Sequence, residues 1–126
     1  MNIRKTLLST LLLSLALSAT AADLLDTVKR RGTLKVAMEG TYPPFNYKEN
    51  GQLAGFEVEL ANALAQKMGV KAEFSTSEWS AILAGLQAGK YDVVINQVGI
   101  SDKRKETFDF STPYTISSPQ LIIRPD

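Results

Sequence analysis

Histidine and cysteine are both absent from this sequence of 126 residues. Without cysteine, the chain has no disulfide framework and no thiol that could carry a lipid anchor. Without either residue type, and with no glycine-rich phosphate loop, the sequence holds no metal-spaced cluster and no recognisable catalytic group. The carboxylates Glu57 and Glu59 lie two residues apart at a predicted helix start, so they point to different faces and are expected to serve the helix dipole. We therefore expect no cofactor, no metal site and no enzymatic reaction.

A strong excess of charge of either sign is also missing, because 14 basic residues stand against 13 acidic ones. Such a balance gives no broad positive field for phosphates, so nucleic acid is not an expected partner. The chain is 44% hydrophobic and 21% charged, which is typical of one small globular domain.

Residues 1–22 have the three parts of a secretory signal peptide. Positive residues 4–5 precede an apolar stretch at 7–17, and small side chains then offer cleavage after Ala21 or Ala22. A membrane anchor would need about 20 apolar residues, more than this stretch has. We expect a soluble exported protein in the periplasm of a bacterium with two membranes, although secretion into the medium would leave the same pattern.

Hydrophobic periodicity predicts helices and strands in alternation. Apolar residues at every second position predict a first strand that ends at Glu39-Gly40. Helical spacing brings five apolar residues of the second helix to one face, which are Leu60, Ala61, Leu64, Ala65 and Met68. The apolar run 93–95 is typical of a strand buried on both faces of a parallel sheet. The expected helices are 24–31, 57–68 and 79–86, and the expected strands are 34–38, 71–76 and 93–95.

Two local signals add detail to this pattern. Asn50-Gly51, which follows a predicted loop at 41–45, favours a tight two-residue hairpin turn. Ser101 is placed to cap a short helix that runs through Thr107.

The alternation of strands and helices predicts an α/β fold with an open, mainly parallel sheet flanked by helices. Ligands bind such sheets outside the carboxyl ends of the strands. The first strand leads into residues 39–42, the third leads into residues 96–104, and Trp79 opens the helix that follows the second strand. We expect these segments, far apart in sequence, to meet at one rim.

The side chains on that rim suit a free amino acid. Arg104 can grip a carboxylate with two parallel hydrogen bonds, helped by the backbone N–H groups at the start of the Ser101 helix. Glu39 can hold an ammonium group directly or through another residue, and aromatic faces can pack the ligand body. The candidate set is Glu39, Tyr42, Trp79, Asn96, Gln97 and Arg104.

Each candidate also has a simpler explanation. Arg104 lies in the charged run 103–106, and such runs are usually solvated. Trp79 could belong to the core, Tyr42 could brace the loop before two prolines, and Glu39 could pair with a surface lysine. Only the convergence of all these residues favours a binding site.

Five motifs resemble family 3 of the extracellular solute-binding proteins, which serve ABC transporters for polar amino acids. The resemblance covers nearly all of the chain after the leader and is strongest to the cystine-binding members. The motifs are Gly55-Phe56-Glu57-Val58-Glu59-Leu60, Glu39-Gly40-Thr41-Tyr42-Pro43-Pro44-Phe45, Asp92-Val93-Val94-Ile95-Asn96-Gln97-Val98, Ile100-Ser101-Asp102-Lys103-Arg104 and Phe108-Asp109-Phe110-Ser111-Thr112-Pro113-Tyr114-Thr115-Ile116-Ser117.

The resemblance implies a periplasmic binding protein of type II, whose two lobes close on an amino acid and then dock on an ABC transporter permease in the inner membrane. Residues 23–115 would form the N-terminal part of lobe 1, which is incomplete here. Residues 116–126 would cross the hinge and begin lobe 2. Such a protein is expected to be a monomer.

The same resemblance implies roles for individual residues. Arg104 would bind the α-carboxylate of the ligand, and Tyr42 and Trp79 would flank its side chain. The other positions carried over are Glu39, near the ligand's amino end, Asn96 and Gln97, which line the pocket, and Ser101, which caps the helix behind the carboxylate.

Two departures from the family pattern bear on affinity. Gly99 stands where members commonly carry threonine or serine, so the N–H group remains but a hydroxyl is lost. A lost hydrogen bond to a charged group costs about 1.5–3 kcal/mol, or one to two decades in affinity. Members are also longer, and their second lobe supplies an acidic residue to the ligand's ammonium. We therefore expect weak or lost binding by this chain.

Two other functions are compatible with the same resemblance. Periplasmic cyclohexadienyl dehydratases resemble these binding proteins, so an enzyme on this fold is one alternative. A sensor lobe that contacts a receptor or permease without a ligand is the other.

Overall fold

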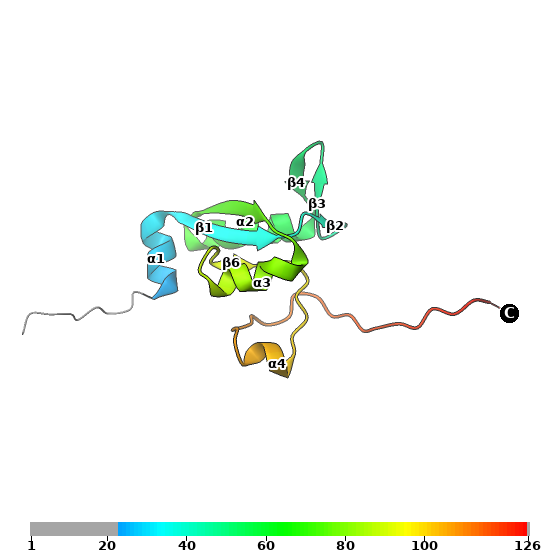
Figure 1. Cartoon of the computed structure of the whole chain (residues 1–126). Helices are drawn as coiled ribbons and strands as arrows, with labels where there is room; N and C mark the ends of the chain where they lie inside the picture. Colours follow the sequence, from blue (N-terminus) through cyan, green and yellow to red (C-terminus); the bar gives the residue numbers. More distant parts are fainter. Residues whose placement is uncertain (1–22, 126) are drawn as a thin grey trace, which may run out of the picture.

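The computed structural model describes residues 23–125, so the predicted signal peptide lies outside the described residues. Three parallel strands form its main sheet in the order β5-β1-β6, with bounds Lys71–Thr76, Thr33–Met38 and Val93–Val94. The central strand β1 runs through the body of the molecule alongside helices α2 and α3 (Figure 1). The predicted open, parallel α/β sheet is confirmed. No helix in this part of the chain is long and apolar enough to cross a membrane.

The helices lie close to their predicted positions. Helix α1 (Leu24–Arg31) ends at Gly32, and α2 (Phe56–Met68) ends at Gly69. Helix α3 spans Trp79–Gln87. Helix α4 (Asp102–Lys105) is shorter than predicted, and its cap is confirmed because Ser101 Oγ accepts a hydrogen bond of 3.3 Å from Arg104 N.

A second, antiparallel sheet stands at the carboxyl end of β1 (Figure 1). Its strands are β2 (Thr41–Tyr42), β3 (Asn46–Glu49) and β4 (Gln52–Ala54). The predicted hairpin turn is confirmed, since Asn50 and Gly51 both have positive φ, at 50° and 81°. Strand β2 lies in the predicted loop at 41–45, because two residues are too few to show a period in the sequence.

The core lies between α2 and the main sheet. Its buried members include Val36 and Met38 on β1 and Val58, Ala61 and Ala65 on α2. The predicted alternation of β1 fails at its carboxyl end, where Ala37 is also fully buried because β1 is the central strand.

The predicted apolar face of α2 is confirmed except at Leu64. Ala61 and Ala65 are buried in the core, and Leu60 and Met68 pack against it. Leu64 is 40% exposed, because the helix turns the side that carries Ala61 and Ala65 toward the sheet. Leu60 and Leu64 also line a cavity of about 690 Å³.

Strand β6 is not buried on both faces, so that prediction is wrong. Val93 and Val94 are only half-buried, and within residues 23–125 β6 pairs with β1 alone, at an edge of the sheet. Both valines line the cavity of about 690 Å³, together with Leu83 on α3. Of the run 93–95 only Ile95, which follows the strand, is buried, and its N–H donates to Ala37 O at 3.0 Å.

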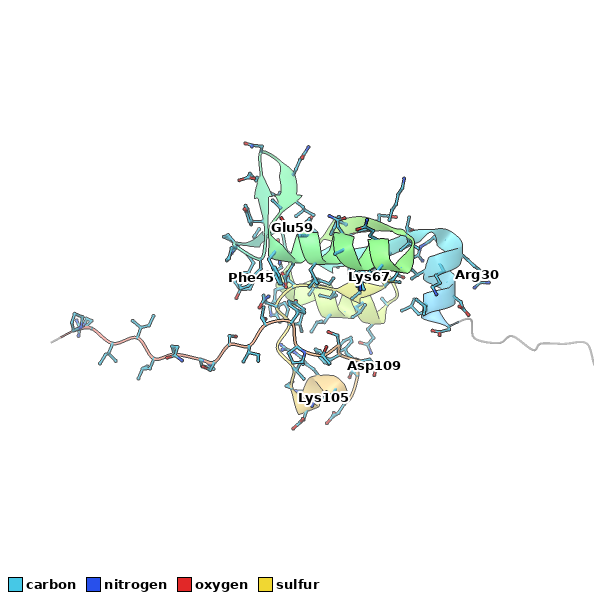
Figure 2. All side chains as sticks on the ribbon, turned by 180° about the vertical axis from the view of Figure 1, so that it is seen from behind. Arg30, Phe45, Glu59, Lys67, Lys105 and Asp109 are labelled. Carbon is cyan, nitrogen blue, oxygen red and sulfur yellow. The ribbon has the colours of Figure 1, made fainter. Side chains whose placement is uncertain are left out.

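Residues 116–125 run away from the domain as an extended segment (Figures 1 and 2). Its apolar side chains contact little else, since Ile116, Leu121 and Ile122 are 97%, 90% and 92% exposed. The body of the domain therefore ends before this segment.

Candidate ligand-binding site

The carboxyl ends of β1 and β6 meet through a pair of side chains. Glu39 follows β1 and Asn96 follows β6. Glu39 N donates to Asn96 Oδ1 at 2.8 Å, and Asn96 Nδ2 donates to Glu39 Oε2 at 2.7 Å. Asn96 is only 3% exposed, so its amide holds Glu39 in place within the protein.

Arg104 turns toward the rim instead of toward solvent. Its Nη1 donates to Gly99 O at 2.7 Å, and its guanidinium carbon lies 5.4 Å from the centroid of the Trp79 ring. This separation is that of a cation–π contact. Lys103 and Lys105 on either side are exposed, while Arg104 is half-buried. A solvated charge run therefore describes the two lysines but not Arg104.

The two predicted aromatic residues are both partly exposed. Trp79 is 41% exposed at the start of α3, whose buried residues are Ile82 and Gly85, so Trp79 is not a core residue. Tyr42 is 45% exposed, and its ring lies 5.3 Å from that of Phe45 at an angle of 60°. Phe45 is at the foot of the hairpin in Figure 2. Tyr42 thus braces the proline loop and still faces solvent.

A buried carboxylate that was not among the predicted site residues lies behind this rim. Glu57, in the first turn of α2, is fully buried. Its Oε2 accepts from Asn46 Nδ2, while its Oε1 accepts from Gln97 N at 2.7 Å and from the hydroxyl of Tyr114. The expected role at the helix dipole therefore describes Glu57 incompletely, although Glu59 does point to a different face and is exposed.

The helical spacing contained a signal for Glu57 that the predicted site did not use. Glu57 is four residues before Ala61 and eight before Ala65, so it shares their buried face. Asn46 gave no comparable signal, because it is a polar residue at the start of a short strand.

Gln97 has a left-handed backbone, with φ at +51°. Outside glycine this conformation is uncommon and costs of the order of 1–3 kcal/mol. Both ends of its side-chain amide bind protein groups, since Nε2 donates to Glu57 Oε1 at 3.2 Å and Oε1 accepts from Thr115 Oγ1 at 2.9 Å. The side chain of Gln97 thus supports the rim from within.

The surroundings of Tyr114 make its hydroxyl a weaker acid. Burial, then the hydrogen bond and the negative charge of Glu57, raises the pKa of Tyr114 well above its ordinary value of 10.0, and a hydrogen bond from the Gln97 backbone opposes them. The hydroxyl of Tyr114 therefore remains a proton donor to Glu57 at neutral pH. Within residues 23–125, no three His, Cys, Asp or Glu side chains are grouped to hold a metal ion.

Residues 34–126 match the family described as bacterial extracellular solute-binding proteins, family 3. This chain belongs to that family. The L-cystine-binding protein TcyJ of Escherichia coli strain K12 is 54% identical over 102 residues, which cover 80% of the chain. The same match covers 38% of TcyJ, so the chain spans about two fifths of the length of this family 3 relative.

Solved structures of amino-acid-binding proteins share the fold of this family 3 chain. The L-cystine solute receptor of Neisseria gonorrhoeae, unliganded and open, has a TM-score of 0.68, with 47% identity over 74% of this chain and 40% of that one. Domain 1 of TmArgBP, in an arginine-bound form of a Phe57Trp mutant, has a TM-score of 0.70 and 36% identity over 72% of this chain and 71% of that one.

An enzyme is also among the similar structures. An ancestral cyclohexadienyl dehydratase has a TM-score of 0.69 and 40% identity, over 72% of this chain and 38% of that one. The fold alone therefore does not separate binding from catalysis.

Proposed function

We propose that this chain binds a free polar amino acid, with cystine as the first candidate, as part of a protein that delivers it to an ABC transporter permease in the inner membrane. The name of the E. coli relative supports cystine, and membership of a solute-binding family supports transport. The sequence of residues 1–22 supports export to the periplasm. The proposed ligand residues are Glu39, Tyr42, Trp79, Asn96, Gln97, Gly99 and Arg104.

The observation that carries this proposal is the position of Arg104. Stacking on Trp79 and bonding to Gly99 O fix the guanidinium while occupying only one of its nitrogens. A guanidinium has five N–H donors, so the others can bind a ligand carboxylate, two of them in parallel. These two contacts hold the guanidinium beside Gly99, where a ligand carboxylate can meet it.

The other rim groups supply the remaining contacts of an amino acid. Glu39 uses Oε2 to accept from Asn96, which leaves Oε1 for the ligand's ammonium. Trp79 and Tyr42 offer ring faces for an aliphatic or sulfur-containing side chain. Because the amides of Asn96 and Gln97 already bind protein groups, we propose that these two residues meet the ligand mainly through their main chain.

One lobe of such a protein can bind an amino acid without the other. Domain 1 of TmArgBP is described in an arginine-bound form, which supports ligand binding by one lobe. A pocket open on one side leaves much of the ligand hydrated, so we propose weaker binding than that of a two-lobed relative.

Replacement of Arg104 by alanine tests this proposal. Isothermal titration with L-cystine should show affinity lost by a factor of about 100 or more in Arg104→Ala, because a desolvated charged hydrogen-bonding group is removed. Lys103→Ala is the matched control and should change affinity by less than about twofold, because Lys103 is exposed. Equal effects of the two changes would refute the role of Arg104.

The dehydratase remains the second candidate function because an enzyme of that kind shares 40% identity with this chain. Incubation with prephenate or arogenate separates the two functions. We expect no aromatic product, and steady product formation would favour the enzyme.

A further inference from the structure

Glu57 is a buried carboxylate without a basic partner among residues 23–125. The ion pairs of this part join Arg31 to Asp92 and Lys105 to Asp102, and neither includes Glu57. A buried charge is costly to desolvate unless hydrogen bonds compensate, and here the N-terminus of α2 and four donor atoms do so. An uncharged side chain would be enough to fill this place in the core, so core packing alone does not explain a carboxylate at position 57.

The donors to Glu57 come from the segments that form the rim. Gln97 follows β6, and its N–H is 2.7 Å from Glu57 Oε1. Asn46 begins β3, donates to Glu57 Oε2, and also donates to Asn96 Oδ1 at 3.0 Å. Asn96 in turn holds Glu39, so one hydrogen-bonded chain joins Glu57 to both ends of the rim. Glu57 itself is 0% exposed and cannot touch a ligand.

The backbone of Gln97 decides the direction of the segment that follows it. Its φ of +51° turns the chain immediately after the buried Asn96. Two residues later, Gly99 O accepts from Arg104 Nη1 at 2.7 Å. A relaxed Gln97 would redirect Val98 and Gly99, and Arg104 would lose the carbonyl that fixes it.

We infer that Glu57 is a positioning residue for the amino-acid site. By accepting both the main-chain and the side-chain N–H of Gln97, it holds the left-handed turn that places Gly99 against Arg104. This inference rests on the proposed function, because ligand affinity is its first readout.

The first test compares two acidic residues of the same helix. L-cystine titrations of the full chain should show Glu57→Gln weakened about tenfold or more, because a neutral amide is a weaker acceptor and turns an NH₂ group toward other donors. Glu59→Gln, at an exposed position labelled in Figure 2, should stay within about twofold of the unchanged chain. Equal affinities of the two variants would overturn the inference.

A pair of double variants separates positioning from a general loss of stability. Both remove the side chain of Gln97, but Glu57→Gln with Gln97→Gly should bind L-cystine about tenfold more tightly than Glu57→Gln with Gln97→Ala, because glycine adopts positive φ without a steric penalty. A purely structural role for Glu57 predicts a lowered melting temperature and equal affinities of the two double variants. If Glu57→Gln does not fold, two single variants that keep Glu57 replace it in the test. Gln97→Ala should bind L-cystine about tenfold more weakly than Gln97→Gly, and equal affinities would overturn the inference.

Amide hydrogen exchange without ligand makes the outcome independent of the proposed function. Glu57→Gln should speed exchange at residues 97–99 while leaving β1 protected, and unchanged exchange at 97–99 would overturn the positioning role. If the unchanged chain binds neither L-cystine nor L-arginine, the proposed function fails, and this exchange experiment alone decides the role of Glu57.

Discussion

Gly99 leaves room for a larger residue beside the guanidinium. A Cβ atom at this position would meet only Arg104 Nη1, at 3.6 Å, which is ordinary van der Waals contact. Gly99→Thr should therefore tighten L-cystine binding by about 10- to 100-fold, because the added hydroxyl can donate to the ligand carboxylate. Titration of Gly99→Ala is the control, since it adds the Cβ without the hydroxyl. No gain of threonine over alanine would contradict the proposed place of the carboxylate.

The hydroxyl of Tyr114 is expected to make the free energy of unfolding fall as pH rises above about 10. Burial and Glu57 raise its pKa in the folded chain above the ordinary 10.0, so between the two values the unfolded chain has released a proton that the folded chain keeps. This contribution is complete below about pH 10 and is lost as pH rises further. Urea unfolding of Tyr114→Phe should show a shallower alkaline decline than the unchanged chain. Tyr47→Phe is the control, and identical slopes in all three would contradict the bond to Glu57.

At this scale the sequence predicts charged and aromatic residues of the rim better than the polar residues behind it. Arg104 and Trp79 were predicted from the rule that ligands bind at the carboxyl ends of strands, and the structure brings them together. Glu57 was predicted only as a helix-dipole residue, because acidic residues at helix starts are usually solvated. Its burial depends on donors from Asn46, Gln97 and Tyr114, which are distant in sequence.

The joint between the hairpin and α2 depends on Gly55. Its φ is +113°, and a Cβ atom there would lie 2.5 Å from Phe45 O and 2.8 Å from Pro44 O. These are backbone atoms that cannot move aside cheaply, so Gly55→Ala should lower the free energy of unfolding by about 2–4 kcal/mol. Gly69→Ala, at a φ of +74° with nothing within 4 Å, should lower it by only about 1 kcal/mol. Denaturant unfolding checks this, and equal losses would contradict the packing at the joint.

Most elements could be predicted because each carries its own local signal. Helix α1 has a capping residue and a terminal glycine, and the hairpin turn has Asn50-Gly51. Strand β5 is long enough, at six residues, to show an alternation of side chains in the sequence. The errors occur where neighbours decide the outcome. Strand β2 forms only through pairing with β3, and the half-exposure of β6 follows from its place at the sheet edge.

Across the whole molecule, one polar network ties the two sheets together. Asn46 on β3 accepts a hydrogen bond from Gly40 N at 2.7 Å and donates one to Asn96, which follows β6. Glu57 accepts a hydrogen bond from Gln97 N. Every buried side-chain nitrogen and oxygen within the described range has a partner. Hydrogen bonds within the protein thus hold the rim residues, which favours the proposed binding with little rearrangement of these residues.

The single tryptophan of the chain reports on the central claim directly, because Trp79 lies beneath the guanidinium at the proposed site. Titration of the chain with L-cystine, followed by tryptophan fluorescence, should give a saturable change that is absent in Arg104→Ala and preserved in Lys103→Ala. A chain in which calorimetry detects cystine binding while Trp79 fluorescence stays constant, or in which Arg104→Ala responds like the unchanged chain, would contradict an amino-acid site on this rim.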